Sequence, residues 1–127
     1  MKVRKMFILL GLSVLFSGLF LSCETAPAAA ITDARGQNVN GTATGFAMGY
    51  AGEVSVTLTV VDGFITDVVA RADHDTAMFS GPVIMRAPND MIRFNTPTAD
   101  IVSGATVTSM AVNEAARNAL DQIIAGQ

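Results

Sequence analysis

Residues 54–68 read VSVTLTVVDGFITDV, and this stretch decides the fold. Apolar and hydroxyl side chains alternate from Val54 to Val60, which is typical of a strand with one buried face. Asp62-Gly63 then indicates a tight turn into a second, antiparallel strand. The centre of the domain is therefore predicted to be a β-hairpin.

The length of the hairpin loop decides which side chains share a face. A two-residue loop would set Leu58 opposite Asp67 and bring a carboxylate onto the apolar face. We therefore predict a three-residue loop, Val61 to Gly63, with Gly63 left-handed, because a slip of one residue exchanges the two faces of a strand. This register groups the apolar residues Val54, Val56, Leu58, Val60, Phe64, Val68 and Ala70.

A further strand is predicted before the hairpin, in residues 41–50. Bulky side chains alternate there with glycine and alanine, which gives one bulky and one small face. We expect the glycines to mark the close approach of another backbone.

Two short helices are predicted after the hairpin. Pro82 favours the first turn of a helix that ends near Ala87, and Pro88 ends it and starts another through Phe94. Met91, Ile92 and Phe94 are expected to be buried. Arg86 and Arg93 are expected on the solvated surface.

The last helix is predicted to follow residues 100–109, which read DIVSGATVTS. The N-terminus of a helix presents unpaired N–H groups and a partial positive charge, so it stabilises an anion such as phosphate. Gly104 and Ala105 leave room for such a group. The hydroxyls of Ser103, Thr106, Thr108 and Ser109 can cap the helix, bind an anion or be modified, and simple capping is the structural alternative. The buried face of this helix is expected to hold Val112, Ala116, Leu120, Ile123 and Ile124.

These elements predict an α+β domain in residues 41–127. A small antiparallel sheet built on the central hairpin is packed by helices, and the C-terminal helix follows the hydroxyl-rich turn. About 105 residues remain after the leader described next, enough for one small domain.

Residues 1–22 are predicted to be a lipoprotein signal peptide. A basic start is followed by an apolar run that ends in small residues before Cys23, the only cysteine of the chain. We expect cleavage before Cys23, its lipidation, and a lead-in or tether in residues 23–40. A transmembrane anchor is the alternative, although the run is shorter than the ~20 residues that span a bilayer. Phe20 departs from the leucine usual at that position.

Charge and composition exclude several functions. Without the leader, five arginines face eleven carboxylates, a net charge of −6, and no lysine remains. Electrostatic binding of nucleic acid is therefore not expected. With Cys23 lipidated, no disulfide and no cysteine-ligated metal is expected, and no metal site is predicted.

The string Asp-x-x-Ser-Gly-Ala-Thr-x-Thr-Ser at residues 100–109 resembles the flavinylation motif of the FMN-binding domain family. That family includes the flavin-carrying subunits of sodium-pumping NADH:quinone oxidoreductase and of its ferredoxin-linked relatives. Residues 50–68 also resemble the family's opening, a glycine-rich segment with a tyrosine that leads into a strand, a glycine turn and a second strand. The resemblance covers about residues 41 to 121.

The resemblance implies roles for particular residues. In the family a flavin transferase joins FMN through its phosphate to the threonine of Ser-Gly-Ala-Thr, which is Thr106 here. Asp100 matches the acidic residue of the motif, for which an Asx-type turn is the alternative. The full set of candidate FMN-contacting residues in this motif is Asp100, Ser103, Gly104, Ala105, Thr106, Thr108 and Ser109.

A second element, His74-Asp75-Thr76, resembles the family's His-x-Glu-Thr segment, whose residues approach the flavin, with aspartate in place of glutamate. The alternative for His74 is an ordinary hydrogen-bonded role at a strand end. Met78 and Phe79 offer apolar surface to a flavin ring, and core packing is the alternative for both.

The resulting hypothesis is a lipid-anchored, extracytoplasmic flavoprotein domain with FMN on Thr106. It would pass electrons between redox partners, which are a redox protein or a membrane electron-transfer complex, and would not be a catalyst by itself. A noncovalent FMN-binding module and a structural lipoprotein without cofactor are the alternatives.

Overall fold

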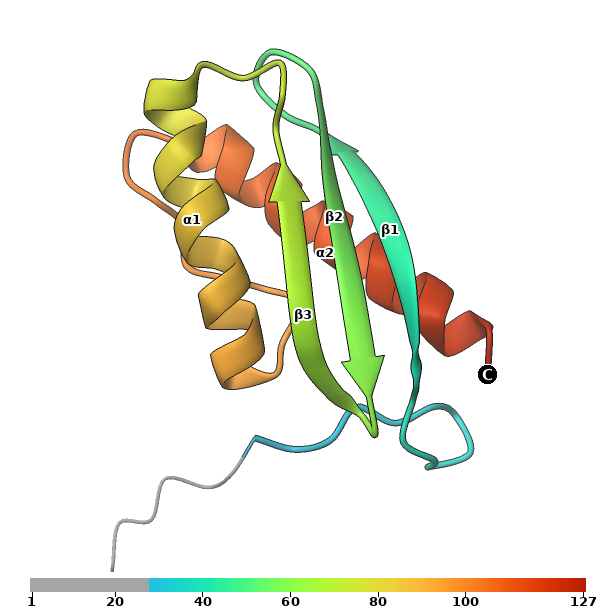
Figure 1. The fold of residues 1–127 in the computed structure, drawn as a ribbon. Coiled ribbons are helices and arrows are strands. Elements are labelled where there is room, and N and C mark those ends of the chain that lie inside the picture. The colour runs from blue at the N-terminus through green and yellow to red at the C-terminus, as the bar shows by residue number, and fades with distance from the viewer. Residues whose placement is uncertain (1–27) are drawn as a thin grey trace, which may run out of the picture.

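The computed structural model describes residues 28–127, so the predicted signal peptide and Cys23 lie outside the described residues. The chain forms an α+β fold, as predicted, in which both helices lie against one face of an antiparallel sheet (Figure 1). Among helices within residues 28–127, none combines the length and the hydropathy that crossing a membrane requires. The elements in chain order are β1 (Gly41–Met48), β2 (Glu53–Val61), β3 (Phe64–Arg71), α1 (Ala77–Phe94) and α2 (Thr106–Ala125).

The hairpin of β2 and β3 differs from the predicted register. Its loop has two residues, Asp62 and Gly63, both at positive φ, and Val61 pairs with Phe64. The pairing then shifts by one residue between Thr59 and Val60, so that Leu58 faces Val68. This bulge removes the carboxylate from the apolar face without lengthening the loop. Val68 and Ala70 are buried as predicted, but Ile65 takes the place expected for Phe64, which is 43% exposed.

The small face of β1 lies directly against α2. A Cβ atom at Gly45 would stand 2.0 Å from the carbonyl oxygen of Ala115 and 2.5 Å from the backbone nitrogen of Ala119. The prediction that a β1 glycine marks a close backbone approach is confirmed at this position. Small residues on both elements therefore set the distance between strand and helix.

The outer edge of β1 is covered by amide side chains of α2. Asn118 donates to the carbonyl oxygen of Phe46 at 3.0 Å, and Gln122 donates to that of Thr44 at 2.9 Å. Strand edges offer unpaired backbone groups to other chains. The amides occupy part of this edge.

Helix α1 is continuous through Pro82 and Pro88, so the prediction of two short helices was wrong. Its buried residues, Ser80, Val83, Ala87 and Met91, recur every three or four positions and pack toward β3. Packing along this stripe outweighs the local cost of the prolines. Ile92 and Phe94 were expected to be buried but lie off the stripe and are exposed.

Asn95 joins three parts of the chain at the end of α1. It adopts a left-handed conformation, with φ 50°. Its side-chain oxygen accepts from Ile65 N at 2.8 Å, while its nitrogen donates to the carbonyl oxygens of Ala29 at 2.8 Å and Gly63 at 3.0 Å. The segment before β1 is therefore attached to the sheet, with Val39 fully buried and Ile31 N bonded to the Gly63 carbonyl at 2.7 Å.

Candidate functional site

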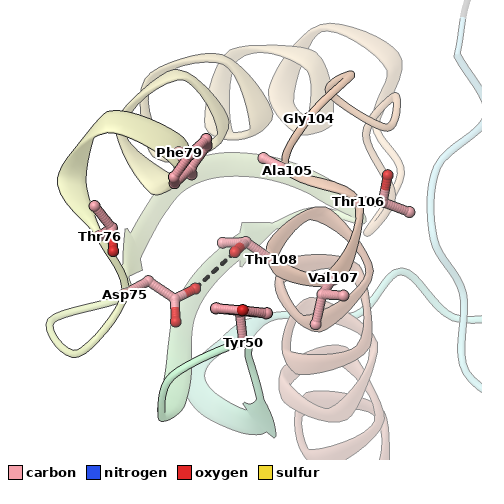
Figure 2. A pocket seen from close by; sticks show the side chains of 9 residues that line it. All are labelled: Tyr50, Asp75, Thr76, Phe79, Gly104, Ala105, Thr106, Val107 and Thr108. Atoms are coloured by element: carbon pink, nitrogen blue, oxygen red, sulfur yellow. Dashed lines mark hydrogen bonds between the residues drawn. The ribbon is translucent and has the colours of Figure 1, made fainter.

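A cavity of about 420 Å³ lies where three parts of the chain meet: the loop between β1 and β2, the segment before α1 with the first turn of that helix, and the start of α2. Cavities of this size hold small organic ligands and cofactors. Figure 2 shows its side chains converging from these three segments. They are Tyr50, Asp75, Thr76, Phe79, Gly104, Ala105, Thr106, Val107 and Thr108.

The N-terminus of α2 forms one wall of the cavity. Ala105 is the residue before the helix, and no side chain of the described residues caps this end. The N–H groups of Thr106, Val107 and Thr108 precede the first helical hydrogen bond, which Ser109 N donates to the Ala105 carbonyl at 2.9 Å. These groups are therefore available to an anionic ligand.

The turn before α2 is held in shape by Gly104 and Ser109. Gly104 has φ 83°, and a Cβ at this position would meet no atom within 4 Å, so the space above it is open. The Ser109 hydroxyl is buried; it donates to the Ala105 carbonyl at 2.8 Å and accepts from Val102 N at 3.1 Å. Ser109 thus stabilises the turn from inside the protein and does not face the cavity.

Asp75 connects the three walls. Its Oδ2 accepts a hydrogen bond from the Thr108 hydroxyl at 2.6 Å, drawn as the dashed line in Figure 2, and its Oδ1 accepts from Ala51 N at 2.7 Å. Partial burial alone would raise the pKa of Asp75, but these bonds, a further one from the Tyr50 backbone and the charge of His74 together lower it. The cavity therefore contains a carboxylate that is ionised at neutral pH.

Apolar side chains border the carboxylate. Tyr50 is 80% exposed and Phe79 is 53% exposed, although both are large and partly apolar. Flat aromatic rings at a cavity mouth can stack on a planar ligand. Core packing, the alternative for Met78 and Phe79, is wrong, because both are exposed.

The structure brings together about half of the residues singled out from the sequence. The residues that line the cavity are Asp75, Thr76, Phe79, Gly104, Ala105, Thr106 and Thr108. Ser103 is exposed outside the lining, and Ser109 is buried beneath the turn. Asp100 is exposed and lines a second, smaller hollow with Asp90 and Phe94.

His74 and Met78 lie beside the cavity and not among its lining residues. His74 packs against Gly52, where a Cβ would stand 2.5 Å from that of the histidine. Arg86 pairs with Asp90 at 3.5 Å, and the Arg93 guanidinium lies 5.2 Å from the Phe94 ring centre, both away from the cavity. Within residues 28–127, no group of three or more histidine, cysteine or acidic side chains is arranged to hold a metal ion.

Tyr50 and Val107 line the cavity but were not assigned to the site from the sequence. Tyr50 stands within the glycine-rich segment that resembles the family's opening, so a signal for it was present. Val107 is an ordinary helix residue by pattern, and only the direction of α2 shows that it borders the site.

Comparison with known proteins decides the family. The sequence model of the FMN-binding domain family matches residues 49–121. The chain belongs to the FMN-binding domain family. The chain is also similar to an NADH:acrylate oxidoreductase from Vibrio harveyi, with 32% identity over 82 residues. That alignment covers 65% of this chain and 8% of the relative, so the chain spans a small fraction of the relative's length.

FMN is thus the cofactor of this FMN-binding domain. The cavity fits such a group on three observations. The uncapped helix end offers N–H groups to a phosphate, Gly104 leaves that approach open, and Tyr50, Phe79 and Val107 offer apolar surface to a flat ring.

Proposed function

We propose that this FMN-binding domain is a lipid-anchored, extracytoplasmic electron carrier that holds FMN in ester linkage on Thr106. The observation that carries the proposal is the position of Thr106. It is the exposed first residue of α2, on the cavity, at a helix end that no described side chain caps. A phosphate esterified there would lie beside unpaired N–H groups.

The proposed attachment is a substitution at phosphorus. The Thr106 oxygen forms a bond to the FMN phosphorus while the bond to the leaving group of an activated FMN donor breaks, and the hydroxyl proton leaves with that group. A flavin transferase would catalyse this step. The chain then gains the mass of FMN less one water.

Each wall of the cavity has a role in this proposal. The start of α2 stabilises the phosphate, the aromatic side chains limit the access of water to the ring, and Asp75 holds a negative charge at a fixed place near it. Bound FMN supplies the reversible uptake of electrons, which no side chain of the protein provides. The residues themselves bind, orient and shield.

The relative supports an oxidoreductive role in general terms. Because the chain matches only 8% of the relative, we do not assign the relative's NADH and acrylate specificities to this domain. We propose instead that the domain exchanges electrons with separate redox proteins. Covalent attachment would keep the cofactor in a compartment where lost FMN is not replaced.

Intact mass spectrometry of the native, membrane-extracted protein tests the proposal. We expect a chain that begins at Cys23, carries acyl groups and is heavier by FMN less water. FMN released by denaturation would show the noncovalent alternative to be right. A chain that retains residues 1–22 would contradict the lipid anchor.

A further inference from the structure

The rim of the cavity is apolar and exposed. Around the cavity, Tyr50 is 80% exposed, Met78 79% and Phe79 53%. Tyr50 belongs to the loop between β1 and β2, and Met78 and Phe79 belong to the first turn of α1; these two segments meet at one end of the sheet (Figure 1). Exposed apolar groups gathered around a binding site mark a docking surface for a membrane or for another protein.

The segment that leads to the proposed anchor is attached at the opposite end of the sheet. Asn95 binds the Ala29 carbonyl, and Gly63 accepts from Ile31 N, both beside the hairpin between β2 and β3. The cavity lies at the other end of β2, next to Glu53. From Glu53 to Val61 the strand spans about 26 Å, at a rise of about 3.3 Å per residue.

The chain between anchor and domain is shorter than this strand. Six residue steps separate Cys23 from Ala29, and fully extended they reach at most about 22 Å. A lipid on Cys23 therefore holds the Asn95 end of the domain near the bilayer. With β2 upright on the membrane, the tether is too short to bring the cavity end down to the bilayer, and only a tilted domain could make that contact.

The charge of the cavity end also favours an orientation in which this end points away from the bilayer. The strand ends and loops at the cavity end carry the carboxylates of Glu53, Asp73 and Asp75 together with Arg71 and His74. An excess of carboxylates is repelled by anionic lipid headgroups and attracts basic side chains.

We propose that the cavity rim, formed by Tyr50, Met78 and Phe79, is the docking surface for a redox protein that approaches from the aqueous side. Its contact surface is apolar and bordered by basic residues, and the rim does not touch the bilayer or a carrier dissolved in it. This inference rests on the proposed lipid anchor at Cys23 and does not require that FMN be covalently bound.

Probes at the two ends of the acylated protein test this orientation. Thr32→Cys places a fluorophore on the exposed segment beside the attached end, and Met78→Cys places the same fluorophore on the rim. The proteins are bound to vesicles of zwitterionic and anionic phospholipids that contain a nitroxide-labelled headgroup. We expect the probe at residue 32 to be quenched at least threefold more strongly than the probe at residue 78.

Equal quenching at the two positions, or stronger quenching at residue 78, would overturn the proposal and show that the rim contacts the membrane. Flotation of the vesicles separates this failure from failure of the anchor. A mature protein that does not float with the vesicles has no lipid anchor, and both the anchor and the orientation are then wrong. Far-ultraviolet circular dichroism of each variant confirms that the fold is intact before labelling.

Discussion

The Thr108 hydroxyl donates a hydrogen bond of 2.6 Å to Oδ2 of Asp75, which joins the first turn of α2 to the segment before α1. The same carboxylate binds the backbone of the loop between β1 and β2. A threonine two positions after Thr106 thus has a structural function, since it holds together the walls of the cofactor cavity.

Thr108→Val should destabilise the domain by about 1.5–3 kcal/mol, because the isostere leaves a partly buried carboxylate without its strongest side-chain donor. Urea unfolding measures the change. Thr42→Val is the matched control, since the Thr42 hydroxyl only bonds to that of Thr59 on the exposed face, at 3.2 Å. Its cost should stay within about 0.5 kcal/mol. Equal costs for both variants would show that the bond to Asp75 contributes little.

Asp75 should make stability depend on pH in the acid range. Its pKa in the folded protein lies below the ordinary value of 3.8, so its stabilising effect is fully present above that pH and is lost as pH falls through the folded value. Wild type should therefore be more stable than Asp75→Asn at pH 7, and the difference should shrink below about pH 4. Urea midpoints at pH 7, 4 and 3 measure this. A difference that stays constant across these values would contradict the assigned ionisation.

Gly45→Ala should strongly destabilise the folded domain. The new methyl group would overlap the backbone of α2 at Ala115 and Ala119, which cannot move without separating helix and sheet. We expect a loss of about 3 kcal/mol or more. The matched control is Gly81→Ala, inside α1, where the added methyl meets no atom within 4 Å. The control should be neutral or stabilising by about 0.5–1 kcal/mol, and thermal unfolding that ranks the two variants otherwise would refute the close approach.

Asn95 should stabilise the folded domain through both its left-handed backbone conformation and its hydrogen bonds. Asn95→Ala loses three hydrogen bonds and places in the left-handed region a residue that tolerates it less well than asparagine, for a cost of about 3 kcal/mol. Asn95→Gly loses the same bonds but accepts the conformation, and should cost about 1 kcal/mol less. Chemical denaturation that finds alanine equal to or better than glycine would contradict the conformational part of this account.

The sequence predicted the elements that depend on local pattern. The alternation in residues 54–60 predicted β2. The small residues that alternate with Thr42, Thr44 and Phe46 predicted the face of β1 that packs on α2. The hydroxyl-rich turn gave the start of α2. In each case the periodicity extends over several residues and agrees with the tertiary packing.

The errors arose where distant contacts override local preference. Pro82 and Pro88 stand inside α1 because Val83, Ala87 and Met91 are buried against the rest of the fold. The bulge near Thr59 restores the apolar face after a two-residue loop, and a count of loop residues alone could not reveal it.

The sequence predicted which motifs form the site but not the hydrogen bonds that hold their residues in place. Asp75 was expected near the flavin from the resemblance, but its bond to Thr108 joins residues 33 positions apart and leaves no mark in the sequence. Ser109 was expected to face the ligand and instead braces the turn from below. Tyr50 lines the cavity from the loop after β1.

Peptide mass spectrometry of residues around Thr106 in protein from native membranes tests the central claim most directly. We expect FMN less water on Thr106, and no flavin on the chain when Thr106→Val is expressed with its flavin transferase, while Thr42→Val keeps the modification. A bare Thr106 in cells with an active transferase, or flavin retained covalently by Thr106→Val, would contradict the account.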